Sequence, residues 1–217
     1  FVPALETYRR VVAMFPEQPW ALHAQAAIGI LLEARCDFEE AAAAFVLLDD
    51  MVQRGRVSDP ALVEHAAVSL RDAGQLYSAL GEHAKASDLF TRYVRQNPMR
   101  PDARLVALEA ASQAAQVGGT AAALRAAAMY EAAAKGVSDP DFQIQAFGAA
   151  AAAAQSGNAP RRRVAALAAR VEQAWQRLSL DHIVDEVDPV TLYYVLLMRL
   201  FAADQAIADF AALSIEA

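Results

Sequence analysis

The chain has 217 residues, 53 of them alanine, with 56% hydrophobic and 21% charged residues and a formal net charge of −7. This composition is too apolar for a disordered chain, and it nearly excludes an all-β fold because alanine favours helices over strands. The acidic balance argues against a nucleic-acid binder, which needs a basic face. The single cysteine excludes an internal disulfide and a zinc site built from cysteines.

No stretch of the sequence predicts a membrane-spanning helix. The longest uncharged stretch, 142–160, contains polar residues and glycines, and the purely apolar runs at 147–154 and 195–198 are short. A spanning helix needs about 20 apolar residues. We therefore expect no direct membrane span in this segment. The sequence shows no signal peptide, and its first residue is Phe1 instead of Met. We therefore interpret the chain as a fragment of a longer one.

Helix-breaking residues recur along the chain, and the segments between them have helical patterns. Ser58-Asp59-Pro60, Ser138-Asp139-Pro140 and Asp188-Pro189 each predict a capped helix start with proline in the first turn. The breakers predict helices over 3–15, 19–35, 38–54, 60–79, 83–96, 101–117, 120–135, 140–155, 160–178, 189–202 and 204–213. The links are short, so we expect sequential helices to pack as antiparallel neighbours.

An internal repeat underlies these helices. The four residues at 57–60 and at 137–140 are identical and lie 80 positions apart, which corresponds to two helix pairs of about forty residues. A small residue, an aromatic residue and a terminating proline recur as Ala4, Tyr8 and Pro16 and again as Ala86, Phe90 and Pro98. Gly29, Gly74 and Gly148 lie inside predicted helices, where glycine costs about 1 kcal/mol relative to alanine. They therefore predict helix contacts that leave no room for a Cβ atom.

These spacings resemble the tetratricopeptide repeat (TPR) family. The clearest unit carries Leu70, Ala73, Gly74, Tyr77, Gly81, Ala86, Phe90, Tyr93 and Pro98. The turn at 36–41 resembles the family's Gly-Asp-Tyr-Glu-Glu-Ala, with Cys36 at the glycine position. The resemblance implies an all-α fold, an α-solenoid in which antiparallel helix pairs form a right-handed superhelix.

We expect one helical-repeat domain over 1–217. Residues 3–16 would be the second helix of a truncated unit, and 189–213 a final or capping helix pair. Full repeat units are expected at 22–54, 67–100, 101–135 and 140–178. Alanine replaces most signature residues in 101–135, so the resemblance is weakest in the second half of the chain.

The segment 8–21 resembles the links between repeats in TPR proteins of the bacterial cell envelope. This resemblance implies a periplasmic or outer-membrane-associated protein, with a cytoplasmic location as the alternative. The first helix would leave an apolar face exposed at 4–15, which an upstream repeat or a partner should cover.

No motif predicts catalysis, a cofactor or a metal. Gly118-Gly119-Thr120 is better read as a turn with Thr120 as helix cap than as a phosphate loop, and the four histidines form no ligand pair. Cys36 lacks a nearby His or a CxxC partner, so we interpret it as a turn residue. The acidic link containing Asp181, Asp185, Glu186 and Asp188 does not follow the calcium-loop spacing.

Partner-binding residues are expected on the first helix of each pair, which lines the concave groove in the family. The resemblance places Glu33, Arg71, Gln75, Ser78, Leu108, Ser112 and Gln145 there. The basic residues with which chaperone-binding members clamp a carboxylate are absent, apart from Arg71. A second candidate is Arg161-Arg162-Arg163, which could bind an acidic partner or could be a solvated helix start balanced by Glu172.

The sequence therefore predicts a non-enzymatic TPR-like scaffold that binds protein or peptide partners in a multi-subunit assembly, without nucleic acid or cofactor. A peptide-sensing regulatory TPR domain of a signalling or transcription-control protein is the first alternative. An α/α-toroid enzyme is the second, but it requires clustered inward carboxylates, and the predicted groove offers only Glu33.

Overall fold

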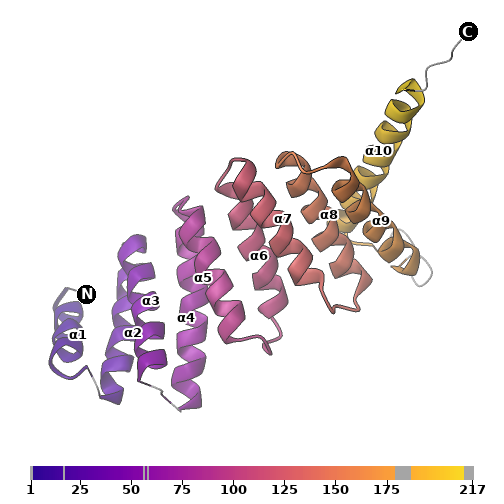
Figure 1. The fold of residues 1–217 in the computed structure, drawn as a ribbon. Helices are drawn as coiled ribbons and strands as arrows, with labels where there is room; N and C mark the ends of the chain where they lie inside the picture. The colour runs from indigo at the N-terminus through magenta and orange to yellow at the C-terminus, as the bar shows by residue number, and fades with distance from the viewer. Residues whose placement is uncertain (1, 17, 56, 58, 179–186, 213–217) are drawn as a thin grey trace, which may run out of the picture. The chain divides into compact units, whose positions relative to one another are not determined.

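The computed structural model describes residues 2–16, 18–55, 57, 59–178 and 187–212, with side chains described to 210. In these residues the secondary structure is helical, with no strand (Figure 1). The helices are α1 Val2–Met14, α2 Pro19–Ala34, α3 Phe38–Arg54, α4 Pro60–Ala79, α5 His83–Gln96, α6 Ala103–Gln116, α7 Thr120–Ala134, α8 Pro140–Ser156, α9 Arg161–Leu178 and α10 Pro189–Ala212.

The structure confirms that a helix begins at each of the three predicted Asp-Pro sequences. The carboxylate of Asp59 accepts a hydrogen bond from the Ala61 backbone N–H at 2.9 Å, and Asp139 accepts one from Asp141 at 3.1 Å. Asp188 accepts one from Val190 at 2.7 Å. Each proline then occupies the first turn, where its missing N–H leaves no hydrogen bond unmade. Thr120, in contrast, begins α7 after Gly119 and is not the cap that the sequence suggested.

The first nine helices lie within two residues of their predicted bounds, but the predicted final pair, 189–202 and 204–213, is wrong. The structure has one continuous helix there, α10 Pro189–Ala212. The physical reason is that no glycine or proline follows Pro189, so nothing in the local sequence ends the helix at position 203.

The continuity of α10 also corrects the expectation that no segment is long enough to cross a membrane. By length and composition alone, one helix in the described part of the chain, Pro189–Phe210, could do so. A single such helix is weak evidence, because mostly buried core helices of soluble proteins pass the same test, although only 17% of this one is buried. In this structure one face of α10 packs on protein, and Arg199 on this helix forms an ion pair with Glu172 of α9 at 3.0 Å.

The chain forms two compact units, Phe1–Gln113 and Ala114–Ala217, where the sequence suggested a single domain. In the first unit, α1 packs on α2, α2 on α3, α3 on α4 and α4 on α5. In the second unit, α7 packs on α8, α8 on α9, and α10 lies against both α8 and α9. Each unit therefore consists of helices that pack on their neighbours in the chain, as short antiparallel links require.

The glycines inside helices lie where a neighbouring helix leaves no room for a Cβ atom, as predicted, and the structure shows that the neighbour is an aromatic ring. A Cβ atom on Gly74 of α4 would lie 2.6 Å from the ring of Phe90 on α5. Gly29 of α2 meets Phe45 of α3 in the same way. Gly148 of α8 differs, because its ring comes from Tyr194 on α10. These contacts set how closely the helices approach.

We predict that Gly74→Ala lowers the melting temperature although alanine is the better helix former. Phe90 is 2% exposed and its ring has no free space into which to move, so the added methyl should cost about 1–3 kcal/mol, or roughly 2–10 °C in Tm. The measurement is thermal unfolding followed by circular dichroism. In a Phe90→Leu background the same substitution should cost much less, and an increase in Tm for Gly74→Ala alone would contradict the packing argument.

Candidate functional site

The residues predicted to line the groove lie on α2, α4, α6 and α8. Glu33 and Gln75 are exposed, whereas Arg71, Ser78, Leu108, Ser112 and Gln145 are half-buried. Gln145 belongs to the second unit and the other six to the first. Two of the seven, Arg71 and Gln145, are engaged in hydrogen bonds between elements, which the sequence did not predict.

Arg71 belongs to a charged cluster formed by Glu64, Arg71, Tyr93, Arg100 and Asp102. Its Nη1 donates to the Oδ2 of Asp102 at 2.9 Å, and its Nη2 lies 3.6 Å from the Oδ1 of Asp72. The Nε of Arg71 is buried and has no hydrogen-bond partner among the described residues. Arg71 is therefore held by acidic neighbours of its own chain, which reduces the positive charge it presents to a ligand.

Asp102, immediately before α6, is the centre of this cluster. The Tyr93 hydroxyl of α5 contacts both of its carboxylate oxygens, at 2.8 and 2.9 Å, and Arg100 Nε lies 3.4 Å from Oδ1. Arg100 also binds Glu64 of α4, with Nη2 3.0 Å from Oε1. The cluster therefore connects α4, α5 and the start of α6 through one carboxylate.

The electrostatics of the cluster follow from these contacts. Partial desolvation raises the pKa of Asp102, but the hydrogen bonds from Tyr93 and Arg71 outweigh it and lower the pKa below its usual value. The hydrogen bond from Arg100 lowers the pKa of Glu64. Burial raises the pKa of Asp72, because Arg71 only partly offsets the loss of solvent. At neutral pH the central carboxylate is thus held ionised, which suits a structural ion pair better than a general acid.

Gln145 takes part in the contact between α8 and α10. Its Nε2 donates to Asp141 Oδ2 and to Thr191 Oγ1, both at 3.2 Å. The hydroxyl of Thr191, fully buried, donates in turn to Asp141 Oδ1 at 2.6 Å. These bonds satisfy the polar atoms that α10 brings into the core of the second unit.

A pocket in the first unit is the strongest candidate for partner binding, and the sequence did not predict it. Its volume is about 770 Å³, within the range of roughly 300–1,000 Å³ in which ligand pockets fall. The turn between α1 and α2, the end of α3 and the start of α4 form its walls. It is lined by Val12, Pro16, Gln18, Pro19, Leu22, Leu47, Met51, Arg54, Gly55, Val57, Asp59 and Leu62.

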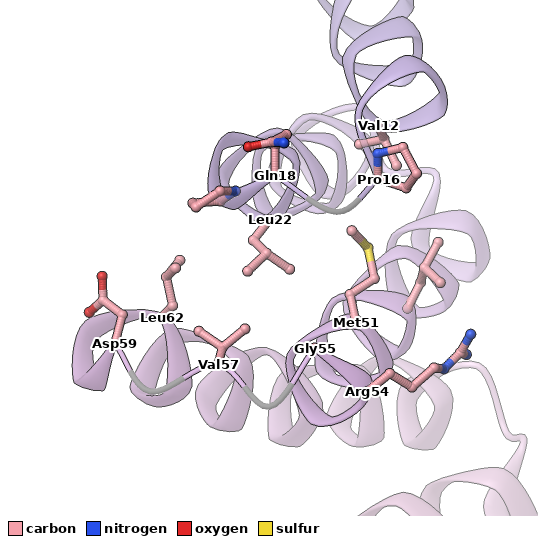
Figure 2. Close-up of a pocket in the computed structure, with 12 residues that line it drawn as sticks. Val12, Pro16, Gln18, Leu22, Met51, Arg54, Gly55, Val57, Asp59 and Leu62 are labelled. Carbon is pink, nitrogen blue, oxygen red and sulfur yellow. The ribbon is translucent and has the colours of Figure 1, made fainter.

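The lining of this pocket is apolar at the centre and charged at the edge. Figure 2 shows Leu22, Met51, Val57 and Leu62 around the central space, with Arg54 and Asp59 on opposite sides. An apolar centre with a few polar groups at its rim is typical of sites that accept apolar side chains.

Two exposed aromatic residues are next in the sequence to residues that line the pocket. Phe15 and Trp20 form an edge-to-face pair with ring centroids 6.3 Å apart, on either side of the pocket-lining turn. Both are exposed, and so are Val2, Tyr8 and Met14 of α1. This confirms the expectation that the first helix leaves apolar residues uncovered. Aromatic and methionine side chains are enriched in protein interfaces.

The structure divides the arginine cluster at the start of α9 into one paired and two exposed side chains, and both of its interpretations stay predictions. Arg163 Nη2 lies 2.6 Å from Glu131 Oε1 of α7, and Arg161 and Arg162 are exposed. Glu172, expected to balance the cluster, instead pairs with Arg199. Two of the three cations therefore remain at the surface of the second unit.

The other residues considered for metal binding or catalysis are the histidines, Cys36 and the acidic side chains. No three His, Cys, Asp or Glu side chains come together as a metal site in the part of the chain that is described. Cys36 is exposed and has φ 63°, a conformation that glycine often supplies. His83 Nδ1 lies 2.8 Å from Gln113 Oε1. His182, Asp181, Asp185 and Glu186 lie outside the described residues.

Solved structures establish the class of fold. A Podosopora anserina protein described as a kinesin light chain with nearly identical TPR-like repeats has a TM-score of 0.50 at 17% identity, covering 80% of this chain and 86% of its own. BtubC (BKLC) from P. vanneervenii has a TM-score of 0.51 at 16% identity, covering 97% of this chain and 85% of its own. The chain thus has a TPR-like helical-repeat fold, as its sequence predicted. No protein-family model matches it, and no curated protein matches its sequence.

We predict that Asp102→Asn destabilises the first unit at neutral pH. The change removes the charge that accepts hydrogen bonds from Tyr93 and Arg71, which should cost about 1–3 kcal/mol and roughly 2–10 °C in Tm. Because the folded pKa of Asp102 is lowered, its contribution is complete above the unfolded value of about 3.9 and is lost as the pH falls through the folded pKa.

The measurement is Tm against pH for the wild type, Asp102→Asn and the control Glu33→Gln, which alters an exposed carboxylate. The difference between wild type and Asp102→Asn should shrink in acid, while Glu33→Gln should follow the wild type throughout. A constant difference at all pH values would show that the charge of Asp102 is not what stabilises the cluster.

Proposed function

We propose that this protein is a non-enzymatic interaction scaffold and that the pocket between α1, α3 and α4 binds apolar side chains of a protein partner. The observation that carries the proposal is the apolar centre of this pocket, with Arg54 and Asp59 at its rim. Stacked helical repeats present extended binding surfaces, and the fold supports protein binding in general.

The charged residues support a scaffold over an enzyme. The ionisable cluster centred on Asp102 lies outside the pocket lining, and the pKa of Asp102 itself is lowered by its own neighbours. Asp72, whose pKa burial raises, also lies outside that lining and pairs with Arg71. A general acid at neutral pH needs a raised pKa and access to a substrate. The pocket itself contains one acidic and one basic side chain, Asp59 and Arg54, and Asp59 already caps α4.

A bacterial cell-envelope assembly is the setting we propose, in the periplasm or at the outer membrane. Its support is the resemblance of 8–21 to envelope TPR links, and this segment supplies Val12, Pro16, Gln18 and Pro19 to the pocket. A peptide-sensing regulatory domain, with a cytoplasmic location, is the alternative. The two differ in what lies beside this chain: a lipoprotein or secretion signal favours the assembly, and a DNA-binding or kinase segment favours regulation.

We predict that Leu47→Lys weakens binding of apolar peptides at least about tenfold, because it places a charge in the apolar lining. Leu47 is 41% exposed, so the change should leave the fold intact. The measurement is selection of a random displayed-peptide library on the immobilised protein, followed by calorimetric titration of a synthesised winner into each variant.

The matched control is Ile30→Lys, which alters an apolar residue of similar exposure, 51%, on α2 outside the pocket lining. It should leave the affinity within about twofold. Peptides that bind wild type and Leu47→Lys equally would contradict the pocket. Loss of affinity only with Ile30→Lys would also contradict it and would favour the groove expected from the sequence, because Ile30 lies one turn before the predicted groove residue Glu33 on α2.

A further inference from the structure

α10 has two apolar faces, and among the described residues only one of them packs on other helices. Thr191, Val195 and Met198 are buried against the rest of the second unit. The opposite stripe consists of Tyr193, Leu196, Leu200, Ala203, Ile207 and Phe210, all exposed. An apolar stripe along 18 residues of the helix is therefore exposed, while the buried residues of its other side lie between Thr191 and Met198.

The spacing of this stripe is that of a coiled-coil seam. Successive members are three, four, three, four and three residues apart, which corresponds to a heptad repeat with Tyr193, Leu200 and Ile207 at a and Leu196, Ala203 and Phe210 at d. A helix that only faces solvent needs no such pattern, and a face that packs across several helices is broader. The seam thus fits one further helix running alongside α10.

The charges beside the seam select the partner. With this register Arg199 occupies position g and Asp204 the following e, which face each other across a parallel, in-register pair of identical helices. An antiparallel pair would instead place Arg199 opposite Ala206 and Asp204 opposite Leu197. Arg199 binds Glu172 through Nε and Nη2, and its guanidinium carbon lies 5.9 Å from the centroid of the Trp175 ring, so Asp204 of a second copy would meet a guanidinium that is already held in place.

We infer that this face of α10 is the interface of a parallel homodimer, with the α10 of a second copy along the Tyr193–Phe210 seam. Thr191, Val195 and Met198 already hold the first half of the helix against the second unit, so dimerisation has to supply less of the cost of ordering it. A bilayer is the less suitable environment, because Arg199 and Asp204 lie near the middle of the apolar stretch Pro189–Phe210.

The test measures mass by light scattering and sedimentation velocity over a range of protein concentrations. The wild type should reach twice the 23.3 kDa of the chain. Leu200→Glu should raise the dissociation constant at least about tenfold, because it places two carboxylates in the seam. The control Leu105→Glu alters a leucine of similar exposure on α6, 59% against 61%, and should leave the dimer intact.

The parallel register is tested by oxidative cross-linking in a Cys36→Ser background. Ala203→Cys should cross-link with its own copy, because d positions face each other in a parallel pair, whereas Ala202→Cys, one residue away and off the seam, should not. Circular dichroism checks that every variant keeps its helix content.

Three results would overturn the inference. One is a wild type that stays monomeric at every concentration. Another is equal cross-linking of Ala202→Cys and Ala203→Cys. The third is a monomer that sediments with phosphatidylcholine–phosphatidylglycerol vesicles and loses this with Leu200→Glu, which would assign the stripe to a membrane.

Discussion

The close approach of a glycine backbone to an aromatic ring is the contact on which the helix pairs depend. Gly29 under Phe45 and Gly74 under Phe90 repeat the same arrangement one unit apart. Because the ring fills the space that a side chain on the first helix would take, the pair can pack closely only with glycine there. The distance between these helices then sets where the next helix can lie, so the register of the first unit follows from two glycines and two rings.

Ion pairs between successive repeats are the second layer of organisation. Arg9 with Glu40 and Arg71 with Asp102 are both 31 residues apart, and Glu131 with Arg163 is 32 apart. Each of these ion pairs joins one helix to the second helix after it, α1 to α3, α4 to the start of α6 and α7 to α9, so a charge on one helix pair meets its opposite on the next. The partly buried members of this set connect neighbouring pairs more firmly than exposed pairs do.

The helices were predictable from the sequence because their ends are marked locally. Asp59-Pro60 and Asp139-Pro140 supply a cap and a first-turn proline within two residues, and the structure places helix starts there. The continuity of α10 was missed because a break was expected where no glycine or proline exists. The pocket and the Asp102 cluster were missed because their members are distant in sequence, although the recurring separation of 31–32 residues between opposite charges is a signal that could have paired Arg71 with Asp102.

The alanine content changes how the helices of the second unit contact one another, compared with those of the first unit. α7 and α8 meet through side chains such as Ala126, Ala127, Ala150, Ala151 and Ala154. Methyl groups form shallow ridges, whereas the rings of Phe45 and Phe90 interlock with the helices that they contact. The backbones of two alanine-lined helices can therefore approach closely along their whole contact, and a larger side chain at any of these positions would push them apart.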